Sequence, residues 1–222
     1  SSPDGTNFNV VPGAVGETYS PGMLTVDTWY KREVTSTYGS KTCVEETNTI
    51  RITVNNFIPG SISADQTICE GGTPAAFTSV TPTGDGTFTY QWKESIDGIV
   101  FTDIAGATGE AFTAGALTAD TWFKRAVIST LNTNICTEET NIIKVTVINF
   151  APGAINADQT ICEGTAPATF TSVAPAGDGV FTYQWQERND NVTYANVASG
   201  GNNPTYTAGP LTQDTYYKRV VT

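Results

Sequence analysis

The sequence predicts an all-β protein built from tandem antiparallel β-sandwich domains. Three observations lead to this prediction: a long segment occurs twice, short stretches alternate between apolar and polar residues, and Gly, Pro and Asp separate these stretches. Thr and aromatic residues are frequent, whereas Lys, Glu and Met are few, which suits extended chain better than helix. No stretch shows a helical period.

The repetition sets the domain organisation. Residues 59–92 align with residues 152–185, and only eight of these 34 positions differ. A second block occurs three times, as DTWYKR (27–32), DTWFKR (120–125) and DTYYKR (214–219). The period is close to the size of a small domain and too long for common solenoid repeats.

We therefore predict three immunoglobulin-sized repeats. Residues 1–57 are the C-terminal part of repeat 1, residues 58–150 are a complete repeat 2, and residues 151–222 are the N-terminal part of repeat 3, whose last strand is missing. The first copy begins inside the repeat and the third stops inside it. The chain is therefore expected to be a window on a longer array.

The complete repeat contains about seven short candidate strands. PTGDG (82–86) and IDG (96–98) are turn signals between strands. Phe88, Tyr90 and Trp92 alternate with polar residues, as in a half-buried strand. In chain order, the predicted strands are 62–68, 75–80, 87–94, 99–104, 110–114, 121–130 and 141–149.

Two details favour an immunoglobulin-like or fibronectin-like sandwich. Trp92 lies on the third strand, where such domains bury a Trp, and Phe123 begins the sixth strand at a fibronectin-type corner. Tyr30 and Tyr217 fill the Phe123 position in the other copies, with hydroxyls able to hydrogen-bond back to the chain. The predicted core positions are Tyr30, Tyr90, Trp92, Phe123, Arg125, Trp185 and Tyr217.

Arg125 shares the parity of the inward aromatic residues. One hypothesis is that its guanidinium stacks on Trp92, a cation–π contact of about 0.5–2 kcal/mol. The alternative is that a strand twist or bulge carries Arg125 to solvent.

The four cysteines occupy two fixed places and predict disulfides in an oxidising compartment. Cys69 and Cys162 lie just before the second strand, and Cys43 and Cys136 lie in the loop between the last two strands. A pair within repeat 2 would join loops about 25 Å apart in such a sandwich, although a disulfide needs Cα atoms within about 7 Å. A bridge between neighbouring repeats and free thiols are the other possibilities.

Charge and composition exclude several classes of function. The net charge of −11 argues against nucleic acid as a partner and against an anionic membrane surface. There is no apolar run of membrane-spanning length. Histidine is absent, which removes the commonest general base and metal ligand.

No catalytic constellation is evident, and we expect no enzymatic activity. The adjacent pairs Glu45–Glu46 and Glu138–Glu139 point to opposite faces of a strand and cannot converge on one bond. The GDG loops at 84–86 and 177–179 lack the Lys and following helix of a phosphate-binding loop, so turn chemistry is the better interpretation.

Two weaker ligand hypotheses remain. No cofactor is expected, but calcium is conceivable because it takes six to eight oxygen ligands, and the candidate ligands are Asp65, Asp85, Asp120, Glu138 and Glu139. Three aromatic residues have outward parity, which suits either stacking on a carbohydrate or packing within the array. They are Trp29, Trp122 and Tyr216.

A family resemblance covers the whole chain. The pattern QTICEGGTPAAFTS…GDGTFTYQWKESIDGIVFTDIAGAT…LTADTWFKRAV…CTEETNIIKVTV resembles the immunoglobulin-like and PKD-like repeats of giant surface proteins of gliding, Bacteroidetes-type bacteria. It is most similar to the arrays of SprB-like gliding-motility adhesins. The resemblance implies type IX secretion and an extracellular, cell-surface location attached to the outer membrane.

The expected function is mechanical. The chain is interpreted as a stalk or filament segment of an adhesin that mediates attachment and force transmission in gliding motility. Its linkers NFIPG (56–60) and NFAPG (149–153) are short, and Pro limits their swing. Expected partners are neighbouring repeats, surface glycans or the substratum, and motility or secretion machinery contacted through regions outside these residues.

Two alternatives stay open at this point. One is a carbohydrate-binding accessory array of a secreted polysaccharide-degrading enzyme. The other is a structural filament that self-associates laterally.

Overall fold

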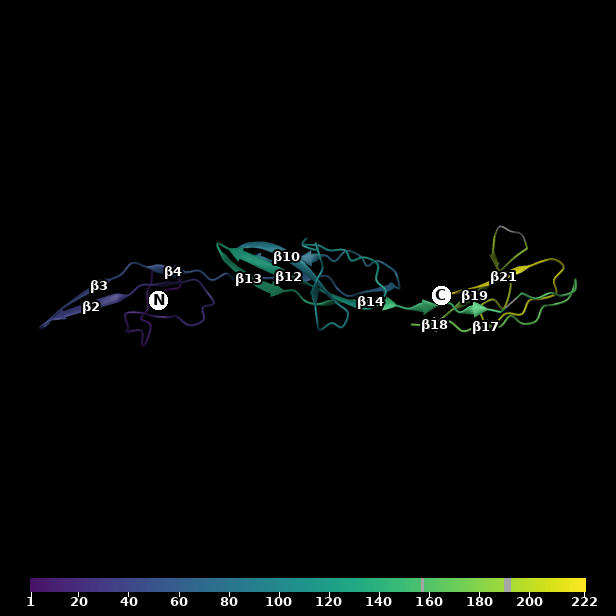
Figure 1. The fold of residues 1–222 in the computed structure, drawn as a ribbon, viewed down its shortest axis with the longest axis horizontal. Helices are drawn as coiled ribbons and strands as arrows, with labels where there is room; N and C mark the ends of the chain where they lie inside the picture. Colours follow the sequence, from purple (N-terminus) through teal and green to yellow (C-terminus); the bar gives the residue numbers. More distant parts are fainter. Residues whose placement is uncertain (157, 190–192) are drawn as a thin grey trace.

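The chain forms three β-rich units that follow one another along one axis (Figure 1). The computed structural model describes residues 1–156, 158–189 and 193–222. Every regular element in these ranges is a β-strand, which confirms the all-β prediction. None of the described residues belongs to a helix long and apolar enough to cross a membrane.

The strands are short except in the centre of repeat 2. Repeat 1 contains β1 (Thr28–Tyr30), β2 (Glu33–Tyr38), β3 (Lys41–Glu46) and β4 (Ile50–Ile52). The first linker and repeat 2 contain β5 (Phe57–Ile58), β6 (Ser61–Ile62), β7 (Gln66–Cys69), β8 (Ser79–Val80), β9 (Thr83–Gly84), β10 (Thr87–Ser95), β11 (Thr102–Asp103), β12 (Thr121–Leu131), β13 (Asn134–Glu139) and β14 (Ile143–Ile148). The second linker and repeat 3 contain β15 (Phe150–Ala151), β16 (Ala154–Ile155), β17 (Ser172–Val173), β18 (Ala176–Gly177), β19 (Tyr183–Arg188), β20 (Ala195–Asn196) and β21 (Tyr216–Val221).

Repeat 2 is organised around one six-stranded sheet. Its strand order is β11-β10-β12-β14-β7, and β13 also pairs with β12. The β10–β12 pair is antiparallel and runs from Thr87 opposite Thr130 to Ser95 opposite Trp122. The β7–β14 pair is parallel. A second layer is built from the β6–β8 pair and a bridge between Phe77 and Phe112.

The core of repeat 2 lies between these two layers. Alternate residues of β12 and β14 point inward, as expected of strands with one buried face. The Phe77 ring packs against Phe123 with ring centroids 4.9 Å apart, and against Trp92 at 5.8 Å. The buried cluster comprises Ile62, Phe77, Trp92, Ala107, Ala114, Phe123, Ile143 and Val145.

Four of the predicted elements differ from the structure. The strand predicted at 62–68 is split into β6 and β7, which join different layers. The strands predicted at 75–80 and 110–114 meet mainly through the Phe77–Phe112 bridge. The loop predicted to hold Cys136 is the strand β13, because residues 134–139 pair with the far end of β12.

Repeat 3 follows the framework of repeat 2. The Nε1 of Trp185 donates to the carbonyl of Asn203 at 3.0 Å, as the Nε1 of Trp92 donates to that of Gly109 at 2.9 Å. A Phe170–Tyr206 bridge takes the place of the Phe77–Phe112 bridge of repeat 2. The described part of repeat 3 contains no counterpart of β14.

Candidate functional site

The candidate functional site is the pair of junctions between repeats, because these determine how the array bends. At the first junction, the N–H of Val54 donates to Oδ1 of Asp27 in repeat 1 at 2.8 Å. Two residues later, the N–H of Asn56 donates to Oδ2 of Asp85 in repeat 2 at 3.2 Å. The N–H of Asp85 donates in return to the carbonyl of Asn56 at 2.8 Å. Only Asn55 lies between the two anchored residues.

The second junction has the same geometry. The N–H of Val147 donates to Oδ1 of Asp120 at 2.8 Å. The N–H of Asn149 donates to Oδ2 of Asp178 at 2.9 Å, and the N–H of Asp178 donates to the carbonyl of Asn149 at 2.8 Å. We call each reciprocal pair, Asn56–Asp85 and Asn149–Asp178, a junction clamp.

Strand pairing extends each clamp. The linker strand β5 pairs with β9 of the GDG loop, and β15 pairs with β18. Phe57 packs on Phe88 with ring centroids 5.7 Å apart, and Phe150 packs on Phe181 at 5.8 Å. Each linker is thus the first strand of the following repeat and has little freedom to swing.

The glycines of the GDG loops permit this close pairing. Gly84 has a φ of +119° and Gly177 a φ of +122°, a conformation that side chains rarely adopt. A Cβ on Gly84 would overlap the carbonyl oxygen of Asn56, and one on Gly177 would overlap that of Asn149. The GDG loops therefore hold the linker in addition to forming a turn.

A hairpin gives the first junction a further contact. The Oγ of Ser129, on the β12–β13 hairpin, donates to the carbonyl of Asp85 at 2.6 Å and lies 3.0 Å from Oδ1 of Asn55. The Nδ2 of Asn55 donates to the carbonyl of Ser129 at 3.2 Å. The Nδ2 of Asn56 donates back to the carbonyl of Thr25 in repeat 1 at 3.0 Å. Side chains of the linker thus contact both repeats.

The junctions fall between segments that a family model also separates. The model of the family described as Domain of unknown function (DUF8696) matches residues 1–56, 58–149 and 151–222. The chain belongs to this family. A comparison with curated proteins finds no match.

The side chains of four of the five candidate calcium ligands of these DUF8696 repeats have partners in the protein, and the fifth, Glu138, is exposed on β13. Asp65 accepts the N–H of Lys144 at 2.7 Å, and Asp120 accepts the Nζ of Lys144 at 2.6 Å. The hydrogen bond from Lys144 is the main reason why the pKa of Asp120 is lowered. Glu139 pairs with Lys124 at 2.6 Å. Among the described residues, no three acidic or Cys side chains converge on a possible metal position.

The aromatic side chains with outward parity are packed within their own repeats. The indole of Trp122 lies against Gly98, where a Cβ would come within 3.2 Å of the ring. The Nζ of Lys144 lies 5.0 Å from the ring centroid of Trp122. Packing by a glycine and a cation leaves less of this indole open to a planar ligand.

The equivalent aromatic residues in the other repeats also contact a cation, although Tyr216 remains 48% exposed. The guanidinium of Arg51 lies 4.8 Å from the Trp29 ring centroid, and that of Arg188 lies 4.8 Å from the Tyr216 ring centroid. Arg51 also pairs with Asp27, the residue that anchors Val54. The aromatic position therefore contributes to the network that fixes the last strand.

Arg125 lies inside the core and not at the surface. It has no exposed area, and its guanidinium lies 4.6 Å from the Tyr90 ring centroid and 5.9 Å from that of Trp92. Its Nη1 donates to the carbonyl of Glu110 at 2.6 Å. Trp92, Phe123 and Trp185 are likewise fully buried, whereas Tyr30, Tyr90 and Tyr217 are half-buried.

The four cysteines, all within the described ranges, are free. Cys136 lies opposite Ser129 on β12. Cys69 lies opposite Ile148 of β14. Thr121, the first residue of β12, pairs with Val145 of β14, so Ile148 lies three residues beyond that end of β12. About eleven residues of strand separate the two thiols, or about 35 Å at about 3.3 Å per residue. This separation excludes the pairing of Cys69 with Cys136 within repeat 2. The four free cysteines are Cys43, Cys69, Cys136 and Cys162.

Proposed function

We propose that the chain is a stalk segment in which force passes from one repeat to the next. The observation that carries this proposal is the junction clamp, which occurs with the same geometry at both junctions. Force along the chain would load hydrogen bonds on both sides of a single intervening residue, Asn55 or Ile148. A stalk needs such short connections, since a flexible linker would let neighbouring repeats fold back.

We further propose that the repeats are immunoglobulin-like sandwiches of a cell-surface adhesin. A buried Trp on β10 and β19, and the parallel pairing of the early strand β7 with the last strand β14 in repeat 2, support the immunoglobulin-like assignment. The resemblance to gliding-motility adhesins supports an extracellular location at the outer membrane and export by type IX secretion. In this proposal, surface glycans or the substratum are bound by the array or by its distal end.

The packing of the outward aromatic residues favours the stalk over the carbohydrate-binding alternative. In an accessory array that binds glycans, an aromatic face would lie open for stacking. In repeats 1 and 2 the Trp at this position contacts a glycine and a cationic side chain of the last strand, Arg51 or Lys144. Retention of the chain on insoluble glycans would overturn this preference.

Beads that carry an antibody to this repeat test the stalk proposal on living cells that produce the protein. The proposal predicts that the beads bind and are carried along the cell surface. Cell-free culture medium is assayed in parallel for the same epitope. Beads that never bind, together with protein released into the medium, would contradict surface display and support a secreted accessory module.

A further inference from the structure

A charged side chain lies in the interior of repeat 2, and another takes the same place in repeat 3. Arg125 on β12 has no exposed area, and its guanidinium lies 4.6 Å from the Tyr90 ring centroid. Arg219 on β21 is half-buried, and its guanidinium lies 5.3 Å from the ring centroid of Tyr183, the counterpart of Tyr90. Burying a charge is costly unless the charged group is hydrogen-bonded. The partners of the two guanidiniums therefore matter.

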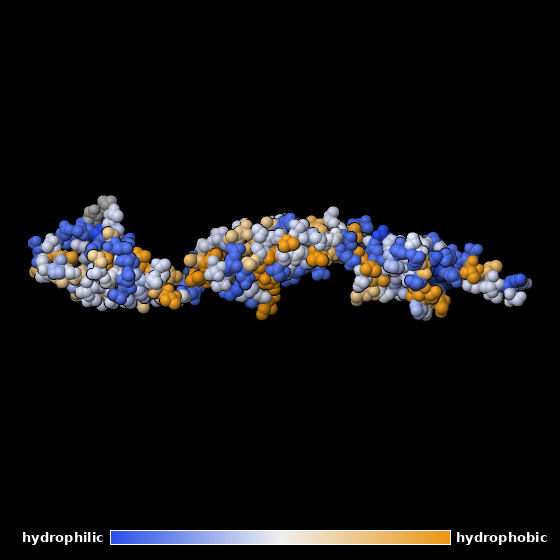
Figure 2. Space-filling model, turned by 180° about the vertical axis from the view of Figure 1, so that it is seen from behind, coloured by the Kyte–Doolittle hydropathy of each residue, from blue (hydrophilic) through white to orange (hydrophobic). Residues whose placement is uncertain are grey.

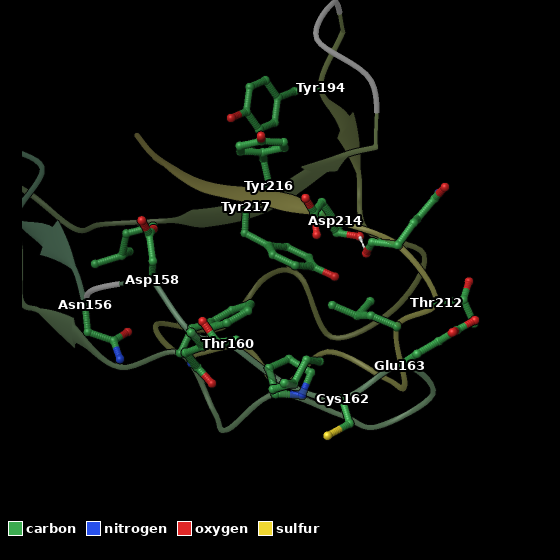
Figure 3. A pocket seen from close by; sticks show the side chains of 18 residues that line it. Asn156, Asp158, Thr160, Cys162, Glu163, Tyr194, Thr212, Asp214, Tyr216 and Tyr217 are labelled. Atoms are coloured by element: carbon green, nitrogen blue, oxygen red, sulfur yellow. Dashed lines mark hydrogen bonds between the residues drawn. The ribbon is translucent and has the colours of Figure 1, made fainter.

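Arg219 lies on the inner side of β21. In Figure 3, Tyr217 points into the interior of repeat 3, whereas Tyr216 points the other way. The Tyr217 ring packs on that of Phe170 with ring centroids 4.8 Å apart. Alternate residues of a strand share a side, so Arg219 lies on the same side as Tyr217.

In repeat 2, the guanidinium holds one loop and the entering linker. The Nη1 of Arg125 donates to the carbonyl of Glu110 at 2.6 Å, and its Nη2 donates to the carbonyl of Pro59 at 3.4 Å. The loop contact recurs in repeat 1, where the Nη1 of Arg32 donates to the carbonyl of Glu17 at 2.7 Å.

The same two contacts occur in repeat 3. The Nη1 of Arg219 donates to the carbonyl of Pro204 at 2.9 Å, and its Nη2 donates to the carbonyl of Pro152 at 3.1 Å. By the alignment of the repeats, Pro152 corresponds to Pro59, and Pro204 corresponds to Glu110 after one inserted residue. Contact between a core guanidinium and the linker proline is thus a property of both junctions.

The linker proline stands at a corner between two short strand pairs. In repeat 2, β5 pairs with β9 and β6 pairs with β8, and only Pro59 and Gly60 lie between β5 and β6. Gly60 has a φ of +71°, and a Cβ there would overlap the carbonyl oxygen of Val80. Each pair spans two residues, and such short pairs are weak on their own. The guanidinium therefore ties this corner to the core.

The corner lies close to the junction clamp. Pro59 is three residues after Asn56, and Pro152 is three residues after Asn149. Only the two residues of β5 or β15 lie between the clamp and the corner. The path of each linker is therefore held at one end by the clamp and at the other by the guanidinium.

We propose that Arg125 and Arg219 are positioning residues that couple the core of each repeat to the direction of the repeat before it. Each guanidinium contacts a core ring, a loop and the proline corner, so a shift of the core moves the linker. Loosening one core would free its own upstream junction and no other. The role in force transmission rests on the stalk function proposed above, in which tension on a linker would reach the core of its own repeat.

Distances between spin labels on native cysteines test the coupling in the 222-residue chain. Cys43 and Cys136 lie at equivalent positions of repeats 1 and 2, on either side of the first junction. Cys69 and Cys162 lie at equivalent positions of repeats 2 and 3, on either side of the second. Each pair is labelled in a chain whose other two cysteines are replaced by Ser, so that parent and variants carry the same labels.

Arg125→Met is expected to broaden the distance distribution of the first pair and to leave that of the second pair unchanged. Arg219→Met is expected to do the reverse, and it provides the same test at the second junction if Arg125→Met fails to fold. The matched control is Val127→Ala, because Val127 is fully buried on β12 and its apolar side chain offers no donor to the linker. This control is expected to leave both distributions unchanged.

Unchanged distributions in both arginine variants, or equal broadening of the two pairs in either variant, would overturn the proposal. Broadening by Val127→Ala to the same extent as by Arg125→Met would also overturn it, since any weakening of the core would then suffice. Broadening confined to the expected pair, in a chain that living cells do not display, would support the coupling and contradict only the stalk function.

Discussion

Arg125 is a charged residue in the interior of repeat 2. Its Nη1 donates to the carbonyl of Glu110, and its Nη2 lies 3.4 Å from the carbonyl of Pro59 at the entrance to the repeat. Its guanidinium covers the rings of Tyr90 and Trp92. Burial lowers the pKa of Arg125, while the nearby Tyr90 and Glu110 act in the opposite direction. The residue therefore connects the first linker, the core and the loop at Glu110.

We predict that Arg125→Met destabilises repeat 2 by about 2–3 kcal/mol. The variant loses a charge-assisted hydrogen bond and cation–π contacts, and it leaves the carbonyl groups of Glu110 and Pro59 without this donor. Urea unfolding followed by hydrogen exchange in β10 and β12 measures the loss for this repeat alone.

Arg32→Met is the matched control, because Arg32 fills the same position in repeat 1 and donates to the carbonyl of Glu17 at 2.7 Å, but is exposed. The control is expected to change stability by less than about 0.5 kcal/mol. If Arg125→Met were as stable as the parent chain, the guanidinium would have no structural role in the core.

Local pattern gave the inward parity of Arg125 but left open whether its side chain reaches solvent, and it gave no sign of the role of Asp85. The inward direction of Arg125 follows from the period of two along a strand, which is a local property. The partner of Asp85 is the backbone of Asn56, 29 residues earlier, and a turn signal at GDG carries no information about it. The recurrence of NF-x-PG and GDG in both junctions was the available signal.

At the scale of the element, an equivalent aspartate helps to fix the last strand in repeat 1 and in repeat 2. Asp27 is bound by Arg51 and the N–H of Val54, and Asp120 by Lys144 and the N–H of Val147. The hydrogen bond from the cation is the largest cause that lowers the pKa of each carboxylate, followed by that from the backbone.

These pKa shifts predict that the repeats lose stability in acid. A carboxylate with a lower pKa in the folded chain than in the unfolded chain stabilises the fold above about pH 4. This stabilisation is lost as the pH falls through the folded pKa. Asp120→Asn is therefore expected to lower stability at pH 7, and its difference from the parent chain is expected to shrink at a pH below the usual Asp pKa of about 3.9. Urea unfolding at the two pH values measures it, and a pH-independent difference would contradict the role of the charge.

Calcium is predicted to have no effect on these elements. Asp65, Asp85 and Asp120 already accept backbone N–H groups, so a cation would have to displace those hydrogen bonds. Adding EDTA or excess calcium is expected to leave Tm unchanged. A higher Tm with calcium would show that the carboxylates rearrange to bind it.

Strands with one strongly buried face were predictable, and those held by few pairs were not. β10, β12 and β14 alternate buried and exposed residues, so the sequence pattern located them within one or two residues. Residues 134–139 are mostly exposed, so their pairing with β12 left little hydrophobic signal. Continuous strands were predicted for the second layer at 75–80 and 110–114, whereas the structure holds much of this layer together by single β-bridges.

At the scale of the whole molecule, the three repeats form one elongated array (Figure 1). On the face shown in Figure 2, apolar side chains lie in separate small groups along the length of the array. The repeats follow each other without a free linker, since Val54 and Asn56 are anchored to different repeats, as are Val147 and Asn149. The length of such an array would grow with the number of repeats.

The stiffness of the junctions is the central claim, and small-angle X-ray scattering of the 222-residue chain tests it most directly. The parent chain is expected to scatter as one extended rod. The double variant Asp85→Ala/Asp178→Ala removes a carboxylate from each junction clamp and is expected to show a smaller mean dimension and a broader distribution of shapes. Glu45→Ala/Asp103→Ala, which removes the same charge from exposed strands, is the control and is expected to scatter like the parent chain. A parent chain that already scatters as flexibly linked domains, or a double variant that stays as extended as the parent, would contradict the account.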